Sequence, residues 1–338
     1  MWETIVTEQK KVRRMGNKRR IILVGAPPAM YNEDQIASIR AAAPDHRVVV
    51  TEERAEIEAV LQDIEIIYSR FPRDLLPGAT SLGWFQQTGA GADWLLRYPE
   101  AIRQDFVLTN ASGVHPINIS EHVLAFMTAF ARGLHDAIKN QQRHEWHEPE
   151  LNQVFELAGK NLLVIGVGAI GSRIAQVASA LGMRVLGLRR HPSKSVEAVS
   201  AMYGPGQLLE ALPKADFVVL TVPLTHETSG MIGEMELSAM KSTAYLINVG
   251  RGGTVQETAL VTALEEGTIA GAGLDVFEQE PLPEDSPLWE MDNVIITCHY
   301  SGLTPDYDER ALGIFLDNLH RYRTRRPLLN RVNKKMGY

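Results

Sequence analysis

The sequence predicts an α/β fold in which two domains each contain a parallel sheet covered by helices. Short apolar runs, of the length of buried strands, alternate with helical patterns from Ile21 onward. A glycine-rich turn near the middle of the chain joins one such strand to a helix. The 338 residues are enough for two domains of ordinary size.

The first third of the chain has the pattern of a parallel sheet. Strands are expected at Ile21–Gly25, Arg47–Val50, Glu65–Tyr68 and Phe106–Thr109, and helices at Asp34–Ala42 and Arg54–Leu61. The apolar stretch Trp84–Gln86 is followed by a turn of small residues, Gly89, Ala90 and Gly91. Such a turn can present backbone N–H groups to a carboxylate, although a plain tight turn would have the same composition.

The middle of the chain carries a dinucleotide-binding pattern. The strand Leu162–Ile165 leads into a Gly-x-Gly-x-x-Gly turn, a helical pattern and a second strand, Val185–Leu188. The turn consists of Gly166, Val167, Gly168, Ala169, Ile170 and Gly171. A helix that begins in this turn can bind a pyrophosphate at its N-terminus. A glycine turn between two core elements is the alternative, but the strand before it and the helix after it favour a dinucleotide site.

The residues after the second strand predict which cofactor is preferred. An NAD site usually has Asp or Glu roughly 20 residues beyond the glycines, where it holds the ribose 2′-OH. Arg189 and Arg190 occupy that place here. A guanidinium can bind a 2′-phosphate through paired, charge-assisted hydrogen bonds, whereas a carboxylate would repel it. We therefore expect NADP(H) to be preferred, with NAD(H) possible; a solvated basic turn is the alternative.

The rest of the chain completes a second sheet. Further strands are expected at Phe217–Thr221, Ala244–Asn248, Ile269–Asp275 and Val294–Thr297, and helices at Asn118–Leu134, Glu234–Met240, Thr258–Glu266 and Asp306–Tyr322. With the two strands around the glycine turn this gives six, the number in a doubly wound dinucleotide domain. The polar segment Lys139–Leu151 is expected to be an exposed excursion, and its two histidines lack the neighbours of a metal site.

Composition excludes several classes of protein. The formal net charge of −7 argues against a nucleic-acid-binding surface. Cys298 is the one cysteine, which excludes an internal disulfide and a cysteine-based metal cluster. No apolar run reaches the length of about 18 residues that spans a membrane. The basic stretch before Ile21 lacks the apolar core of a secretory signal and is interpreted as a solvated tail rather than a nucleic-acid arm, so we expect a cytoplasmic location.

Three charged residues each come soon after a predicted strand of the second sheet: Arg251, Glu280 and His299. Because the carboxyl ends of parallel strands lie at one edge of a sheet, we expect these side chains to share that edge. A guanidinium can clamp a carboxylate, a histidinium can protonate a carbonyl oxygen, and a carboxylate can orient the imidazole. Any one of them could be a surface charge, but all three at successive strand ends indicate carbonyl reduction.

From about Trp84 to Gly313 the sequence resembles the D-isomer-specific 2-hydroxyacid dehydrogenase family. The segments that carry the likeness are GVGAIGSRIA, VPLTHETSGMI, INVGRGG, AGLDVFEQEPLP and NVIITCHYSG. The resemblance implies that Arg251, Glu280 and His299 form the catalytic triad. It implies that the amides of Gly89, Ala90 and Gly91, together with Arg251 and His299, hold the substrate. It also implies that the cofactor lies along Val222, Pro223, Val249 and Asp275.

The resemblance further implies an architecture of two Rossmann-like, doubly wound domains that close over a cleft. Residues 1–112 and 304–338 would form a discontinuous, flavodoxin-like substrate domain, and residues 113–303 would form the dinucleotide-binding domain. Family members form homodimers through the cofactor domain, so a homodimer is expected.

These patterns predict an NADP(H)-dependent reductase of small 2-oxo acids, of the glyoxylate and hydroxypyruvate type, that makes D-2-hydroxy acids with His299 as proton donor. Two departures from the family pattern leave the substrate open: Cys298 stands where Pro is frequent, and Tyr300 stands where a smaller residue is common. The alternatives are a cofactor-sensing binding protein on the same fold and a phosphite- or formate-type dehydrogenase. Glu280 argues against formate dehydrogenases, which have Gln at that position.

Overall fold

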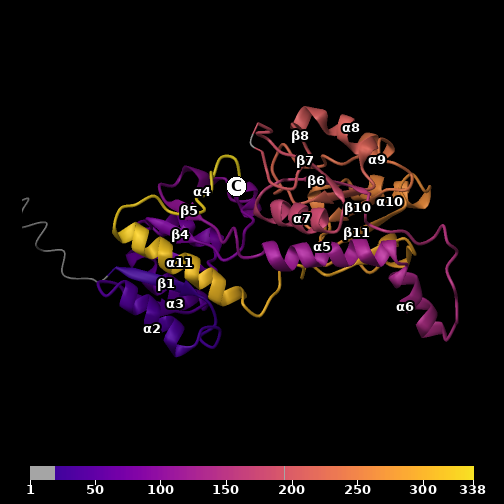
Figure 1. The fold of residues 1–338 in the computed structure, drawn as a ribbon. Coiled ribbons are helices and arrows are strands. Elements are labelled where there is room, and N and C mark those ends of the chain that lie inside the picture. Colours follow the sequence, from indigo (N-terminus) through magenta and orange to yellow (C-terminus); the bar gives the residue numbers. More distant parts are fainter. Residues whose placement is uncertain (1–19, 194) are drawn as a thin grey trace, which may run out of the picture. The chain divides into compact units, whose positions relative to one another are not determined.

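The computed structural model describes residues 20–193 and 195–338, which fold as two compact units. The first unit runs to Ala111 and resumes over Asp308–Tyr338, so both parts of a divided chain build it. The second unit is Ser112–Tyr307. Each unit contains one parallel sheet with helices packed on it, which confirms the predicted α/β class (Figure 1).

The first unit has a five-stranded parallel sheet in the order β2-β1-β3-β4-β5. The strands are β1 (Ile21–Gly25), β2 (Arg47–Val50), β3 (Ile64–Ser69), β4 (Trp84–Gln86) and β5 (Val107–Thr109). The helices are α2 (Glu33–Ala42), α3 (Arg54–Val60), α4 (Glu100–Arg103) and α11 (Tyr307–Arg323). Successive strand residues point alternately into two hydrophobic cores. One core includes Phe315 of α11, which stacks on Trp84 of β4 with 5.2 Å between ring centroids.

The second unit has a seven-stranded parallel sheet in the order β12-β11-β10-β9-β6-β7-β8. The strands are β6 (Asn161–Ile165), β7 (Arg184–Leu188), β8 (Ala201–Tyr203), β9 (Phe217–Leu220), β10 (Tyr245–Asn248), β11 (Gly271–Leu274) and β12 (Val294–Ile296). The helices are α5 (Pro116–Ala131), α6 (Leu134–Arg143), α7 (Ala169–Ala180), α8 (Leu208–Ala211), α9 (Glu234–Ser238) and α10 (Glu257–Glu265). The strand order reverses between β6 and β9, and such a reversal is where doubly wound sheets bind their ligands.

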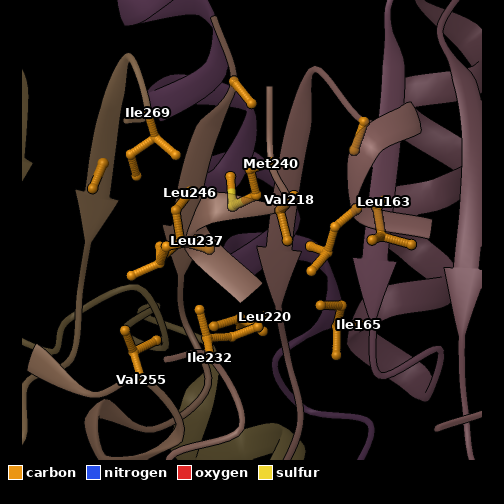
Figure 2. Close-up of a cluster of buried hydrophobic side chains, with 14 of the residues drawn as sticks. Leu163, Ile165, Val218, Leu220, Ile232, Leu237, Met240, Leu246, Val255 and Ile269 are labelled. Carbon is orange, nitrogen blue, oxygen red and sulfur yellow. The ribbon is translucent and has the colours of Figure 1, made fainter. Parts of the chain in front are cut away.

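Both faces of the second sheet are buried, which explains why its strands are nearly continuous apolar runs. One face packs against α5 and α7, and the other packs against α8, α9 and α10. Figure 2 shows side chains of the latter core, among them Leu163 of β6, Val218 of β9, Leu246 of β10 and Leu237 of α9. This double cover fixes the register of the strands, and so it fixes the loops at their carboxyl ends.

Three elements differ from the sequence-based expectation. The second sheet has seven strands rather than six, because β8 adds a short strand at its edge. The segment expected to be an exposed excursion is exposed where it is helical, but its residues 139–143 form the second half of helix α6. In the first sheet, the apolar stretch Trp84–Gln86 is a fully buried strand, β4.

Candidate active site

The glycine turn between β6 and α7 has the geometry of a phosphate-binding loop. Gly166 has a φ of +104°, which favours glycine, and an added Cβ at Gly171 would lie 2.2 Å from the Gly166 carbonyl oxygen. At Gly168, the N-cap of α7, an added Cβ would meet nothing within 4 Å. The first and last glycines are therefore required for close packing, whereas Gly168 faces open space at the N-terminus of a twelve-residue helix. That arrangement fits a dinucleotide pyrophosphate.

The neighbouring loops at the carboxyl ends of the strands pack against this turn. The Thr221 hydroxyl donates to the Gly166 carbonyl at 2.6 Å, just after β9. An added Cβ at Gly250, after β10, would lie 2.8 Å from the Val222 carbonyl oxygen. Val222 and Pro223 are half-buried and Val249 is buried. The predicted cofactor residues after β9 and β10 thus lie at the same edge of the sheet as the glycine turn, which follows β6 across the reversal.

Both arginines that follow β7 stand at the same edge. The Arg189 N–H donates to the Tyr203 carbonyl of β8 at 3.0 Å, which fixes the backbone here. The Arg190 guanidinium forms an ion pair with Glu227, a residue of the loop after β9. No local pattern predicts this pairing, because 37 positions separate the two residues.

His299 and Glu280 meet at the ends of β12 and β11. Nδ1 of His299 lies 2.7 Å from Oε2 of Glu280. Because an ionised carboxylate only accepts hydrogen bonds, Nδ1 carries the proton and Nε2 is the other ring nitrogen, directed away from Glu280. Oε1 of Glu280 accepts from the Phe277 N–H at 3.1 Å, which holds the carboxylate in place. The side chains are 45% and 37% exposed, so this pair is open to an incoming molecule.

The loop that carries His299 is tied down by Asp275, which is fully buried. Its carboxylate accepts from the hydroxyls of Thr297 at 2.6 Å and Ser301 at 2.5 Å, and from the backbone N–H groups of Tyr300 and Ser301. Its own carbonyl accepts from the His299 N–H at 2.8 Å. These bonds hold His299 at a φ of +53°, a conformation that few non-glycine residues adopt.

His122 of α5 extends this network. Its Nε2 lies 3.0 Å from the Thr297 hydroxyl, which already donates its proton to Asp275, so the imidazole donates to the hydroxyl. Burial lowers the pKa of His122, although the Asp275 carboxylate acts against that change. The ring packs edge-on against Tyr300 at 5.3 Å between centroids. No motif of the sequence selected His122 as a site residue.

Arg251 follows β10 on a loop fixed by Asn248, which is buried. The Asn248 side chain donates to the Arg251 carbonyl at 3.1 Å and accepts from the Gly250 N–H at 3.1 Å. The Arg251 guanidinium donates to the Gly250 carbonyl at 2.8 Å. Burial lowers the pKa of nearby His115, the hydrogen bond to the Gly302 carbonyl acts against that change, and the positive charge of Arg251 adds to it. An added Cβ at Gly252 would lie 1.9 Å from the Phe277 carbonyl carbon, so this loop packs directly on the one leading to Glu280.

Comparison with known proteins identifies the family. The model for the NAD-binding domain of D-isomer specific 2-hydroxyacid dehydrogenases matches residues 124–301. This chain belongs to the D-isomer specific 2-hydroxyacid dehydrogenase family. It is therefore an oxidoreductase of that family with a nicotinamide-cofactor domain, as the sequence motifs predicted.

Among its relatives in that dehydrogenase family, the glyoxylate reductase of Korarchaeum cryptofilum is 33% identical over 300 residues, which cover 87% of this chain and 88% of the relative. A D-3-phosphoglycerate dehydrogenase of Methanocaldococcus jannaschii is 33% identical over 79% of this chain, but the match spans only 51% of that relative. The NADPH-dependent glyoxylate/hydroxypyruvate reductase of Sinorhizobium meliloti, solved with NADP and sulfate, is 27% identical. It aligns over 94% of this chain and all of its own, with a TM-score of 0.81.

The first unit of this dehydrogenase carries the small-residue turn of Gly89, Ala90 and Gly91. All three carbonyl oxygens accept hydrogen bonds: Gln87 donates to Gly89 and Gly91, and Asn110 donates to Ala90 at 2.7 Å. An added Cβ at Gly89 would meet nothing within 4 Å. The turn is therefore fixed from its carbonyl side by the side chains of Gln87 and Asn110, neither of which belongs to a recognised motif.

Two further observations concern what the described chain does not contain. Among residues 20–193 and 195–338, no group of three or more His, Cys, Asp or Glu side chains is placed to hold a metal ion. Within the same residues, no helix is both long and apolar enough to cross a membrane. Lys194 lies outside the described residues, and so does the basic tail, residues 1–19.

Proposed function

We propose that this dehydrogenase reduces small 2-oxo acids of the glyoxylate and hydroxypyruvate type to D-2-hydroxy acids, with NADPH as the preferred reductant. The observation that carries the proposal is the 2.7 Å contact between His299 and Glu280 at the strand-end edge that also carries Arg251 and the glycine turn. Proton donor, anion clamp and dinucleotide loop thus belong to one sheet.

The chemistry assigned to each residue follows from its contacts. A bound nicotinamide would supply the hydride that reaches the carbonyl carbon. His299 donates the proton from Nε2 to the carbonyl oxygen, so that one hydride and one proton convert the oxo group to a hydroxyl. Glu280 keeps the proton on Nδ1 and stabilises the charged imidazole. Arg251 binds the substrate carboxylate through paired hydrogen bonds and draws charge from the adjacent carbonyl.

The preference for NADPH rests on Arg189 and Arg190, which stand where an acidic residue would hold a ribose 2′-OH. Gly166–Gly171 would hold the pyrophosphate, and Val222, Pro223 and Val249 would line the rest of the dinucleotide. The S. meliloti neighbour with NADP bound supports the same preference. Asp275 stands beside this row, but its carboxylate oxygens are occupied by the His299 loop.

The amides of Gly89, Ala90 and Gly91 are proposed to bind the substrate carboxylate from the first unit. The carbonyl groups of that turn are occupied by Gln87 and Asn110, which leaves its other side for an anion. In this proposal the first unit is the substrate domain and the second is the cofactor domain.

A homodimer is supported by the exposed apolar residues around α6. Trp146 and Leu151 are both 95% exposed, and Ile138 of α6 is 57% exposed. Figure 1 shows α6 and the segment after it standing out from the rest of the second unit. Exposed apolar side chains on a projecting segment are typical of a surface that a partner covers. We propose that a second copy of the chain covers it.

An assay of cofactor oxidation tests the function. Glyoxylate and hydroxypyruvate are each supplied with NADPH or NADH, and kcat/KM is compared across the four pairs. We expect turnover with both acids and a higher kcat/KM with NADPH. Reduction of NADP⁺ by phosphite or formate instead would favour that alternative activity, and cofactor binding without turnover of any 2-oxo acid would favour a binding protein.

A further inference from the structure

The ion pair between Arg190 and Glu227 places a negative charge inside the region proposed to receive a 2′-phosphate. Arg190 follows β7, and its side chain is 32% exposed. Glu227 comes from the loop after β9, and its side chain is 64% exposed. The two loops flank the point where the strand order reverses, so the pair lies at the edge assigned to the cofactor.

The loop presents Glu227 from a fixed turn. The Thr225 N–H donates to the Thr228 hydroxyl at 2.9 Å, and that hydroxyl donates to the Pro223 carbonyl at 2.6 Å. The Glu227 N–H donates to the Thr225 hydroxyl at 3.3 Å, and Thr225 itself is buried. Because the turn begins at a residue proposed to line the cofactor, the position of Glu227 relative to the cofactor is set by the same loop.

A carboxylate in this place acts on the two cofactors in opposite directions. It neutralises one of the two guanidinium groups that would bind a 2′-phosphate, and it repels the phosphate directly. It also offers an acceptor to a ribose 2′-OH, which is the task that Asp or Glu performs at the end of the second strand in NAD sites. Both effects reduce the discrimination between NADPH and NADH.

We propose that Glu227 is a specificity-determining residue that limits the preference for NADPH and lets the same site accept NADH. Arg189 and Arg190 favour the phosphorylated cofactor, and Glu227, although it comes from a different strand, takes the place of the acidic residue that is missing after β7. This inference rests on the proposed cofactor preference, since it assigns Arg190 to the 2′-phosphate.

Calorimetric titration of the full chain with NADPH and with NADH tests the inference without relying on turnover. The variants are Glu227→Gln, Arg190→Ala and the control Glu234→Gln, which removes one exposed carboxylate at the start of α9. For Glu227→Gln we expect the ratio of Kd for NADH to Kd for NADPH to rise about three- to tenfold at low salt, and the rise to shrink at high salt. For Glu234→Gln we expect the ratio to stay within about twofold of its original value.

The outcomes separate this inference from the cofactor proposal. If Arg190→Ala lowers the ratio while Glu227→Gln leaves it at the control value, the role given to Glu227 is wrong and the cofactor preference stands. If Arg190→Ala leaves the ratio unchanged, the assignment of Arg190 to the 2′-phosphate is wrong and the role of Glu227 falls with it. A raised ratio for Glu227→Gln together with a lowered ratio for Arg190→Ala supports both.

Discussion

At the scale of single residues, Asp275 organises the loop that carries His299. Its buried carboxylate accepts hydrogen bonds from Thr297, Tyr300 and Ser301, on both sides of the imidazole. A buried carboxylate is costly unless all its oxygens are bound, so these bonds and the position of His299 depend on one another. The site is thus set by a side chain that does not itself supply the proton.

Asp275→Asn is expected to lower both stability and turnover. The amide would keep the shape of the carboxylate but would place an NH₂ group against donors, which leaves buried groups unpaired. The free energy of unfolding should fall by about 2–4 kcal/mol, as measured in urea. Asp292→Asn is the control, because Asp292 is 87% exposed and should change stability by less than about 1 kcal/mol. Equal stability of both variants would contradict this account.

Gly252→Ala is expected to disturb Glu280 from the neighbouring loop. The added Cβ would lie 1.9 Å from the Phe277 carbonyl carbon, so the backbone leading to Glu280 must move. We expect a loss of about 1–3 kcal/mol in stability, together with a lower kcat. Gly253→Ala is a matched control, since its Cβ would come within 3.3 Å of only the flexible end of Leu224. Similar effects of the two variants would show that the contact with Phe277 is unimportant.

At the scale of elements, α11 is joined to the first sheet through the buried carboxylate of Glu65. This carboxylate accepts from the Tyr322 hydroxyl at 3.1 Å and from Arg20 at 2.9 Å, and it lies 3.1 Å from Nε2 of His46. Burial alone would raise the pKa of Glu65, but the bonds from His46 and Arg20 lower it. The hydrogen bond to Glu65 raises the pKa of His46 against the effect of its burial.

This pair predicts how stability depends on pH. The pKa of His46 is higher in the folded than in the unfolded state. Its contribution to the free energy of unfolding is therefore full below its unfolded pKa of about 6.5 and is lost as pH rises through its folded-state pKa. The pKa of Glu65 is lower in the folded than in the unfolded state. Its contribution to the free energy of unfolding is therefore full above about pH 4.5 and is lost as pH falls through its folded-state pKa.

Urea unfolding of the parent and of Glu65→Gln across this range measures the effect. We expect the difference in unfolding free energy to be largest between about pH 5 and pH 6.5 and to shrink on either side. Glu58→Gln, at a carboxylate that is 47% exposed, serves as the control. A difference that does not change with pH would mean that the His46–Glu65 pair does not titrate as described.

Long apolar elements could be predicted from the sequence, whereas short or polar ones could not. The residues of β1 and β2 were predicted with their observed bounds, because apolar runs end there at polar or turn residues. β8 has only three residues, too short an apolar run to be distinguished in the sequence, and it pairs with β7. α6 is polar on most of its surface, so the sequence indicated that the segment from Lys139 is exposed but not that its first residues are helical.

The same limit applies to the candidate site. His299 and Glu280 could be selected because each follows a strand, and the structure places them in contact. Glu227, His122 and Gln87 are polar or charged residues whose sequence neighbours form no motif. No local pattern therefore distinguishes them from ordinary surface residues. Their partners are set by the order of strands in the sheet, which composition and periodicity do not specify.

At the scale of the whole molecule, both units place their candidate groups after the carboxyl ends of parallel strands. The second unit carries the proposed cofactor loop and acid, and the first carries the proposed anion-binding turn of Gly89–Gly91. In the proposed assignment, substrate recognition can change through the first unit while the proposed proton donor and its partners stay fixed in the second.

The exposed residues after α6 predict an assembly of two copies. Trp146→Glu together with Leu151→Glu should convert a homodimer to a monomer, because two charges would be buried at the interface. Sedimentation equilibrium of the parent and the double variant measures this. Leu209→Glu, at another exposed leucine of the second unit, should leave the dimer intact. A parent chain that sediments as a monomer would contradict the prediction.

The most direct test of the central claim is the rate of NADPH oxidation with glyoxylate by His299→Asn. Asparagine tolerates the left-handed backbone of this position, so the loop should be retained while the proton donor is lost. We expect kcat to fall about 10²- to 10⁴-fold, with the Kd for NADPH within about twofold of the parent and Cys298→Ala close to full activity. A His299→Asn variant that keeps kcat within a few-fold of the parent would contradict the account.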